Sequence, residues 1–120
     1  MTSAPAAHDW DTAAIALDAM AILRMDPETD PDADRVISAA VVACAVLDQE
    51  LDTETPLDPI PAPVEYAAVL VTIELYRRKD APFGVLNAWS VDDVMIQLSP
   101  DTLRSVRKLV RPYKARFGVS

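Results

Sequence analysis

Residues 61–79 read PAPVEYAAVLVTIELYRRK, and this stretch decides the fold. Its middle, residues 66–73, is apolar on nearly every side, which is typical of a helix buried at the centre of a domain. The prolines at its start suit the first turn of a helix, and the three cations at its end suit the negative end of the helix dipole. The pattern predicts a central helix from about Pro61 or Pro63 to Lys79.

On the N-terminal side, the sequence predicts a first helix from about Asp9 to Met25 with Asp9 as its cap, stopped by Asp26-Pro27. Apolar residues recur there at three- and four-residue steps, which is the helical period. The expected apolar face consists of Trp10, Ala13, Ala14, Leu17, Met20 and Ala21.

A second helix is expected from about Pro31 to Leu51, with Asp30 as its cap and Asp32 and Asp34 in the first turn, where the helix dipole favours negative charge. Its expected buried stripe consists of Ile37, Ala40, Val41, Cys44, Leu47 and Leu51.

After the central helix, alternation of apolar residues predicts a short strand at residues 93–98. Its partner is either a hairpin arm at residues 85–89 or a neighbouring subunit. Ser99-Pro100-Asp101 is a strong helix start, so a last helix is expected at residues 100–110. That helix is expected to bury Leu103, Val106 and Val110 and to end at Pro112.

These elements predict a mainly α fold, a small bundle of about four helices with a buried central helix and a short β-strand or hairpin before the last helix. The chain has 120 residues, 51% of them apolar, which is enough for one core and too few for two. Residues 1–120 are therefore expected to form a single domain, with a leader at 1–8, a proline-rich acidic loop at 52–62 and a tail at 112–120.

The composition argues against catalysis. Two glycines are too few for a phosphate cradle, and one His and one Cys exclude both an internal disulfide and a zinc site of the usual His and Cys ligands. His8 is expected to be an exposed residue near the terminus. Cys44 is expected to be a small core residue rather than a nucleophile. No catalytic residue, cofactor or metal, and no membrane-spanning segment, is predicted, so the chain is not expected to be an enzyme.

The acidic segment DPETDPDAD at residues 26–34 resembles a calcium loop only in part. Asp30, Asp32 and Asp34 have the spacing of the first three ligands, but Arg35 stands where such a loop needs Gly and Val41 where it needs Glu. The segment is therefore interpreted as a solvated loop and helix cap.

Charge is strongly polarised along the chain, which has a net charge of −8. Residues 1–60 hold thirteen acids and two bases, whereas residues 101–120 hold one acid and six bases. Arg104, Arg107, Lys108 and Arg111 follow helical spacing and share one face. That face is either a solvated surface or a contact for an acidic protein or for phosphate, and the net negative charge favours protein. Opposite charges at the two ends also suit a head-to-tail contact between copies, which can close into a ring.

Three segments carry a resemblance to a known family: PVEYAAVLVTIELYRRKDAPFGV at 63–85, DVMIQLS at 93–99 and RPYKARFG at 111–118. Their order resembles the head-to-tail adaptor proteins of tailed bacteriophages, also called head-completion or head-tail connector proteins. The resemblance is strongest over residues 61–117.

The resemblance implies a structural virion protein located in the neck, at the capsid vertex, after assembly in the host cytoplasm. Such adaptors form a homo-oligomeric ring, usually of twelve copies, under the portal protein. The ring extends the DNA channel and receives the stopper or tail-completion protein, and DNA passes through the lumen without sequence-specific binding. The residues expected at contacts with the portal or a neighbouring subunit are Tyr76, Arg77, Arg78, Pro82, Phe83, Arg104, Arg107, Lys108, Arg111, Pro112, Tyr113, Arg116 and Phe117.

An alternative function is a small helical regulatory protein, antitoxin-like, that uses its basic C-terminal helix. A dimer that shifts a DNA probe at physiological salt would distinguish this function from ring formation.

Overall fold

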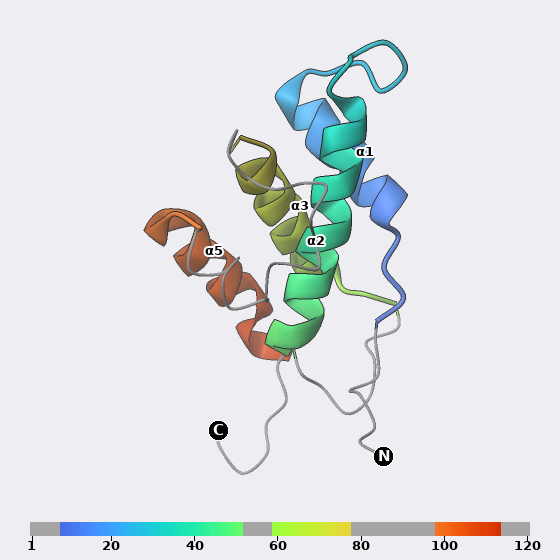
Figure 1. Ribbon diagram of the computed structural model, residues 1–120. Coiled ribbons are helices and arrows are strands. Elements are labelled where there is room, and N and C mark those ends of the chain that lie inside the picture. Colours follow the sequence, from blue (N-terminus) through green and yellow to red (C-terminus); the bar gives the residue numbers. More distant parts are fainter. Residues whose placement is uncertain (1–7, 52–58, 78–97, 114–120) are drawn as a thin grey trace, which may run out of the picture.

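The computed structural model describes residues 8–51, 59–77 and 98–113, which form a compact helical bundle (Figure 1). Its elements are α1 (Thr12–Leu23), α2 (Ala33–Leu51), α3 (Ala62–Arg77), α5 (Pro100–Val110) and the short 3-10 helix η2 (Arg111–Tyr113). The predicted mainly helical bundle is confirmed. None of the described residues forms a strand: the predicted strand at 93–98 lies outside them except for Leu98, which is buried in a bend.

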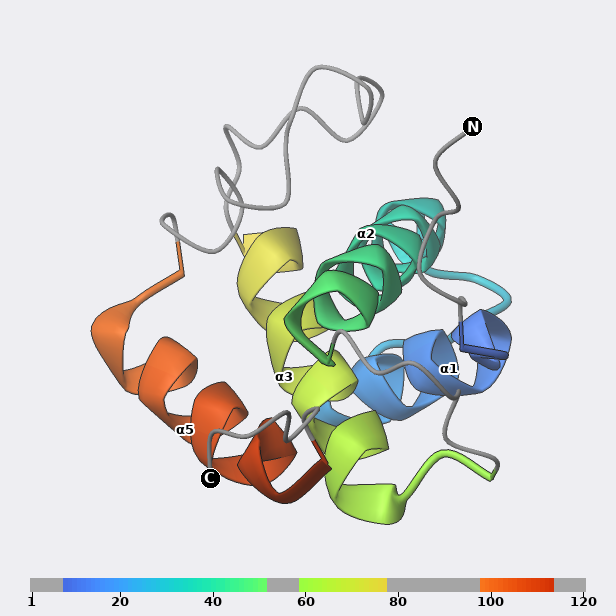
Figure 2. The same cartoon turned by 90° about the horizontal axis from the view of Figure 1, so that it is seen from below.

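Helix α3 is the centre of the bundle, as its apolar sequence predicts. It contacts α1, α2 and α5, and Figure 2 shows it between α1 and α5. Most of its middle is buried, including the polar Thr72, whose hydroxyl donates a 2.7 Å hydrogen bond to the carbonyl of Ala68. The exceptions are Tyr66, which is 49% exposed, and Leu70, which is partly buried. Arg77 lies in the last turn as predicted, while residues 78 and 79 lie outside the described residues.

Small side chains make up much of the buried surface of α2 and α3. These two helices make the most extensive helix–helix contact in the described part of the chain. Five alanines on them are completely buried: Ala39, Ala40, Ala43, Ala67 and Ala68. Small buried side chains of this kind suit close packing of helices, and we call this set the alanine seam.

Helix α1 is shorter than predicted at both ends. Asp11, not Asp9, caps it, because the Asp11 carboxylate accepts the backbone N–H of Ala14 at 3.0 Å. The helix ends at Leu23 because Arg24 adopts the left-handed conformation (φ 60°), and its N–H reaches back to Ala21. This is a standard helix termination, and it precedes Asp26-Pro27.

The predicted apolar face of α1 is partly wrong: Met20 is buried and Trp10 packs against the core as predicted, but other members of the face are exposed. The structure buries Ile15, Ala16, Ala19 and Met20, whereas Leu17 is 51% exposed. Ala13 and Ala21 are exposed as well. The physical reason is composition: apolar residues occur all around this helix, so the three- and four-residue spacing fits more than one face.

Helix α2 follows its prediction more closely. Ala40, Cys44, Leu47 and Leu51 are buried as expected, but Ile37 and Val41 are 45% and 44% exposed, so their placement in the buried stripe is wrong. The buried side of the helix also includes residues that were not predicted to be buried, namely Val36, Ala39, Ala43 and Val46.

The start of α2 also differs from the prediction. The helix begins at Ala33 rather than Pro31, so Asp32 precedes the first turn and only Asp34 lies in it. The Asp30 carboxylate accepts the backbone N–H of Asp32 at 2.8 Å, which closes a turn just before the helix rather than capping the helix itself.

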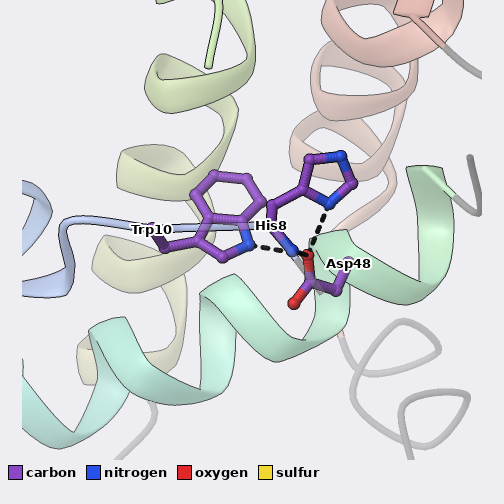
Figure 3. Close-up of polar contacts among 3 residues, drawn as sticks. All are labelled: His8, Trp10 and Asp48. Carbon is purple, nitrogen blue, oxygen red and sulfur yellow. Dashed lines mark hydrogen bonds and ion pairs between the residues drawn. The ribbon is translucent and has the colours of Figure 1, made fainter. Parts of the chain in front are cut away.

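The expectation that His8 is exposed is wrong. The residue is 6% exposed and lies beside Trp10 against α2 (Figure 3). The His8 backbone N–H, its ring Nδ1 and the Trp10 indole Nε1 all lie within 3.1 Å of one oxygen of Asp48. Sequence reasoning missed this contact because it joins residues about forty positions apart. It fixes residues 8–11 to the bundle.

Helix α5 has the bounds that the sequence predicts. Ser99 caps it, and the Ser99 hydroxyl oxygen accepts the backbone N–H of Thr102. Val106 and Val110 are completely buried, and Leu103 is partly buried against the core. No helix in the described part of the chain is long and apolar enough to cross a membrane.

Candidate protein–protein interface

The last helix, α5, is the most strongly amphipathic helix in the described part of the chain. Its apolar side, with Val106 and Val110, packs mainly on α3. Its other side carries Arg104, Arg107 and Lys108, and Arg111 follows directly at the start of η2. These four cations, predicted to share a face, are all exposed. We call these four residues the basic face.

A polar network holds the start of α5 on α3. The Thr102 hydroxyl donates a 2.9 Å hydrogen bond to Glu74 of α3, and the Ser99 hydroxyl lies 2.9 Å from Thr102 Oγ1. Ser99 is also 3.4 Å from the same Glu74 oxygen. Because these contacts supplement the buried valines, the orientation of the basic face is set by the fold.

The cations of the basic face are weakly neutralised by their own chain. Arg104 lies 3.6 Å from Asp101, but their side chains are 77% and 95% exposed, so water screens the pair. Arg107 lies 3.4 Å from Glu50 of α2 and is still 55% exposed. Lys108 and Arg111 form no ion pair with any other described residue. The positive charge of this face therefore remains available to a partner.

The basic face also has an apolar part. An open hollow of about 320 Å³ runs along α5 and is lined by Pro100, Leu103, Arg104, Arg107 and Arg111. Arginine binds carboxylates in a bidentate fashion and stacks on aromatic rings, and it is enriched at protein interfaces. A surface of this kind suits an acidic protein partner that also offers apolar side chains.

Tyr76, predicted at an interface, is engaged within its own chain. Its hydroxyl donates a 2.9 Å hydrogen bond to Asp32, and the Arg35 guanidinium lies 5.2 Å above its ring. The hydrogen bond to Asp32, together with partial burial and nearby carboxylates, raises the pKa of Tyr76. Tyr76 therefore joins the end of α3 to the start of α2.

The other predicted contact residues are spread over the chain. Arg77 is exposed at the end of α3, and Pro112 is exposed in η2. Tyr113 is partly buried and packs against the core, so only part of its side chain faces outward. Five predicted contacts lie outside the described residues: Arg78, Pro82, Phe83, Arg116 and Phe117.

The side chains that could act in catalysis or metal binding instead pack in the core or form internal hydrogen bonds. Cys44 is 4% exposed, as expected of a core residue, and burial together with the negative charge of Asp48 raises the pKa of its thiol to about 12. Asp32 of the acidic segment binds Tyr76, and Asp30 binds backbone. Within residues 8–51, 59–77 and 98–113, no three His, Cys, Asp or Glu side chains are grouped as metal ligands.

Sequence reasoning missed a second surface, a groove between α1 and α3. It has a volume of about 440 Å³ and is lined by Asp18, Ala21, Ile22, Ala62, Glu65, Tyr66 and Val69. Tyr66 lies in an apolar run that predicts burial on every side, so no local signal marked its exposure.

Comparison of the chain with protein-family models, curated proteins and solved structures finds no match.

Proposed function

We propose that this protein is a structural adaptor whose copies associate into a ring, as the head-to-tail adaptors of tailed phages do. In that role the ring sits under the portal, extends the DNA channel, and receives the stopper or tail-completion protein. Two observations support this function: the resemblance of the sequence to these adaptors and the exposed cations of the basic face.

The observation that carries the proposal is the exposure of the basic face on an otherwise acidic molecule. The sequence of residues 1–60 holds thirteen acids and two bases, while Lys108 on α5 and Arg111 directly after it have no anionic partner among the described residues. A chain with two such surfaces is complementary to its own copies. A head-to-tail contact of this type forms a ring when its rotation closes.

The acidic surface also fits the passage of DNA through a ring. Like charge between carboxylates and phosphates removes the contacts that dominate nucleic-acid affinity. DNA can then slide past the ring without being held. We therefore propose that the acidic residues limit binding to DNA, whereas the cations serve contacts between proteins.

One alternative rests on the same cations. Three of them, Arg104, Lys108 and Arg111, are exposed along α5 and at the start of η2, with either a screened ion pair or none among the described residues. This arrangement also suits a regulatory protein that binds phosphate groups of DNA. The net charge of −8 weakens this alternative because it opposes long-range attraction to DNA.

We also propose a non-catalytic role. The buried thiol of Cys44 and the engagement of His8 with Asp48 support it, since both of these reactive groups are used in packing. Hydrolysis that is lost when one carboxylate is replaced would contradict this proposal.

The test is the mass of the assembled protein. Mass photometry of the purified chain, and negative-stain images of the chain mixed with its phage's portal protein, should show rings or portals capped by an extra ring. A protein that stays monomeric in both conditions would refute the proposal. A dimer that shifts a DNA probe at physiological salt would favour the regulatory alternative.

A further inference from the structure

The groove between α1 and α3 combines apolar and acidic surface. Ile22 and Tyr66, which line it, are large side chains that are 52% and 49% exposed. Ala21 and Val69 add smaller apolar surface, while Asp18 and Glu65 supply one carboxylate from each helix. The groove therefore offers apolar contact and two negative charges together.

The basic face of α5 has the complementary composition. Its hollow joins the apolar Pro100 and Leu103 to three arginines. The arginines follow one another at three- and four-residue steps along α5 and into the start of η2. A helix lying in a groove is a common mode of recognition. The two surfaces thus match in both charge and apolar character.

We propose that the α1–α3 groove of one copy binds the basic face of α5 from the next copy, and that this contact builds the ring. The inference rests on the proposed function and names the surface that receives the cations. Asp18 and Glu65 would pair with arginines of the neighbouring α5, and Leu103 would lie against the apolar part of the groove.

Tyr66 strengthens this assignment. Its ring is half-exposed in the groove, and arginine stacks favourably on aromatic rings. The chain already makes such a contact internally, where Arg35 lies 5.2 Å above the ring of Tyr76. Tyrosine and arginine are also the residues that most often carry binding energy at interfaces.

The arrangement of the helices makes this contact intermolecular. Figure 2 shows α1 and α5 on different sides of α3, and α5 is held there by its buried valines. One copy therefore presents its basic face and its groove in different directions. Each copy can give α5 to one neighbour and receive α5 from another, which is a heterologous contact capable of closing into a ring.

Two double charge reversals test the contact. Arg104→Glu with Arg111→Glu reverses the basic face, and Asp18→Lys with Glu65→Lys reverses the groove. Because like charges then meet across the interface, each double variant should weaken self-association by about 100-fold, measured by mass photometry alone and on portal particles. An equimolar mixture of the two variants restores both complementary pairs and should assemble again.

A matched control reverses two exposed carboxylates outside the groove, Asp9→Lys with Glu28→Lys, and should assemble as the wild type does. Circular dichroism should show that all three variants are folded. If the groove variant assembles like the control, or if the mixture of the two interface variants stays monomeric, the inference is wrong while the proposed function stands. If the wild type itself never assembles, alone or on portal, the proposed function fails and the inference fails with it.

Discussion

The indole of Trp10 donates a 2.7 Å hydrogen bond to Asp48, 38 residues further along the chain. The same oxygen of Asp48 also receives the backbone N–H of His8 and lies 2.8 Å from His8 Nδ1 (Figure 3). Three nitrogens thus converge on one carboxylate of α2, and they attach the segment before α1 to the bundle.

Replacing Asp48 with Ala should lower the free energy of unfolding by about 3 kcal/mol. Hydrogen bonds to a charged acceptor are worth more than neutral ones, and the groups of buried His8 and partly buried Trp10 would lose their acceptor. Urea denaturation followed by circular dichroism measures the change. Gln49→Ala, at the exposed neighbouring position, is the control and should change stability by less than about 0.5 kcal/mol. Equal effects of the two variants would show that the Asp48 contacts contribute nothing.

Tyr76 should make stability depend on pH in the alkaline range. Its pKa is raised above the value of about 10 expected in the unfolded chain. The stabilisation is therefore fully present below about pH 10 and is lost as the pH rises through the raised pKa. Tyr76→Phe should be less stable than wild type by about 1 kcal/mol at pH 8, because the bond to Asp32 is lost.

The measurement is the difference in urea stability between wild type and Tyr76→Phe at pH 8 and at pH 11. That difference should shrink at the higher pH, since deprotonation removes the same hydrogen bond from the wild type. Tyr66→Phe controls for loss of a hydroxyl from an exposed ring. A difference that stays constant with pH would contradict the role of the Tyr76 hydroxyl.

The cap of α5 should contribute measurably to stability. Ser99→Ala removes the oxygen that accepts the Thr102 N–H and is expected to cost about 1 kcal/mol. Ser105→Ala, at an exposed position inside the same helix, should be neutral or slightly stabilising, because alanine favours helix. Thermal melts of both variants give the comparison, and equal melting temperatures would rule out a capping role for Ser99.

Cys44 should be inert in the folded protein. Burial and the nearby charge of Asp48 raise the pKa of its thiol to about 12, so little thiolate exists at pH 8. The aromatic disulfide reagent DTNB should react with it slowly in buffer and completely in 6 M guanidinium. Rapid reaction of the native protein would show that α2 opens locally near this residue.

The sequence predicts some elements of this fold well, for identifiable reasons. The bounds of α5 follow from Ser99-Pro100-Asp101, since a cap followed by proline fits only the first turn of a helix. The burial of α3 follows from its nearly continuous apolar surface. In both cases the signal is local and does not depend on what the helix packs against.

Other features depend on contacts between distant segments. Alanine-rich α1 has apolar residues on several faces, so only packing against α2 and α3 selects Ile15 over Leu17. His8 is buried because Asp48 accepts its bonds, and no local pattern signals that pair. The basic face was identifiable from helical spacing, whereas the α1–α3 groove depends on how two helices separated by α2 come together.

The alanine seam has a consequence for how this small domain tolerates change. Alanine has no rotamers to freeze, so packing α2 against α3 loses little side-chain entropy, and a core poor in bulky residues can still close. A closely packed core of small side chains also has little room for larger ones. A larger residue at Ala40 or Ala68 would overpack a completely buried position, so such substitutions should be depleted in any library that selects for folded protein.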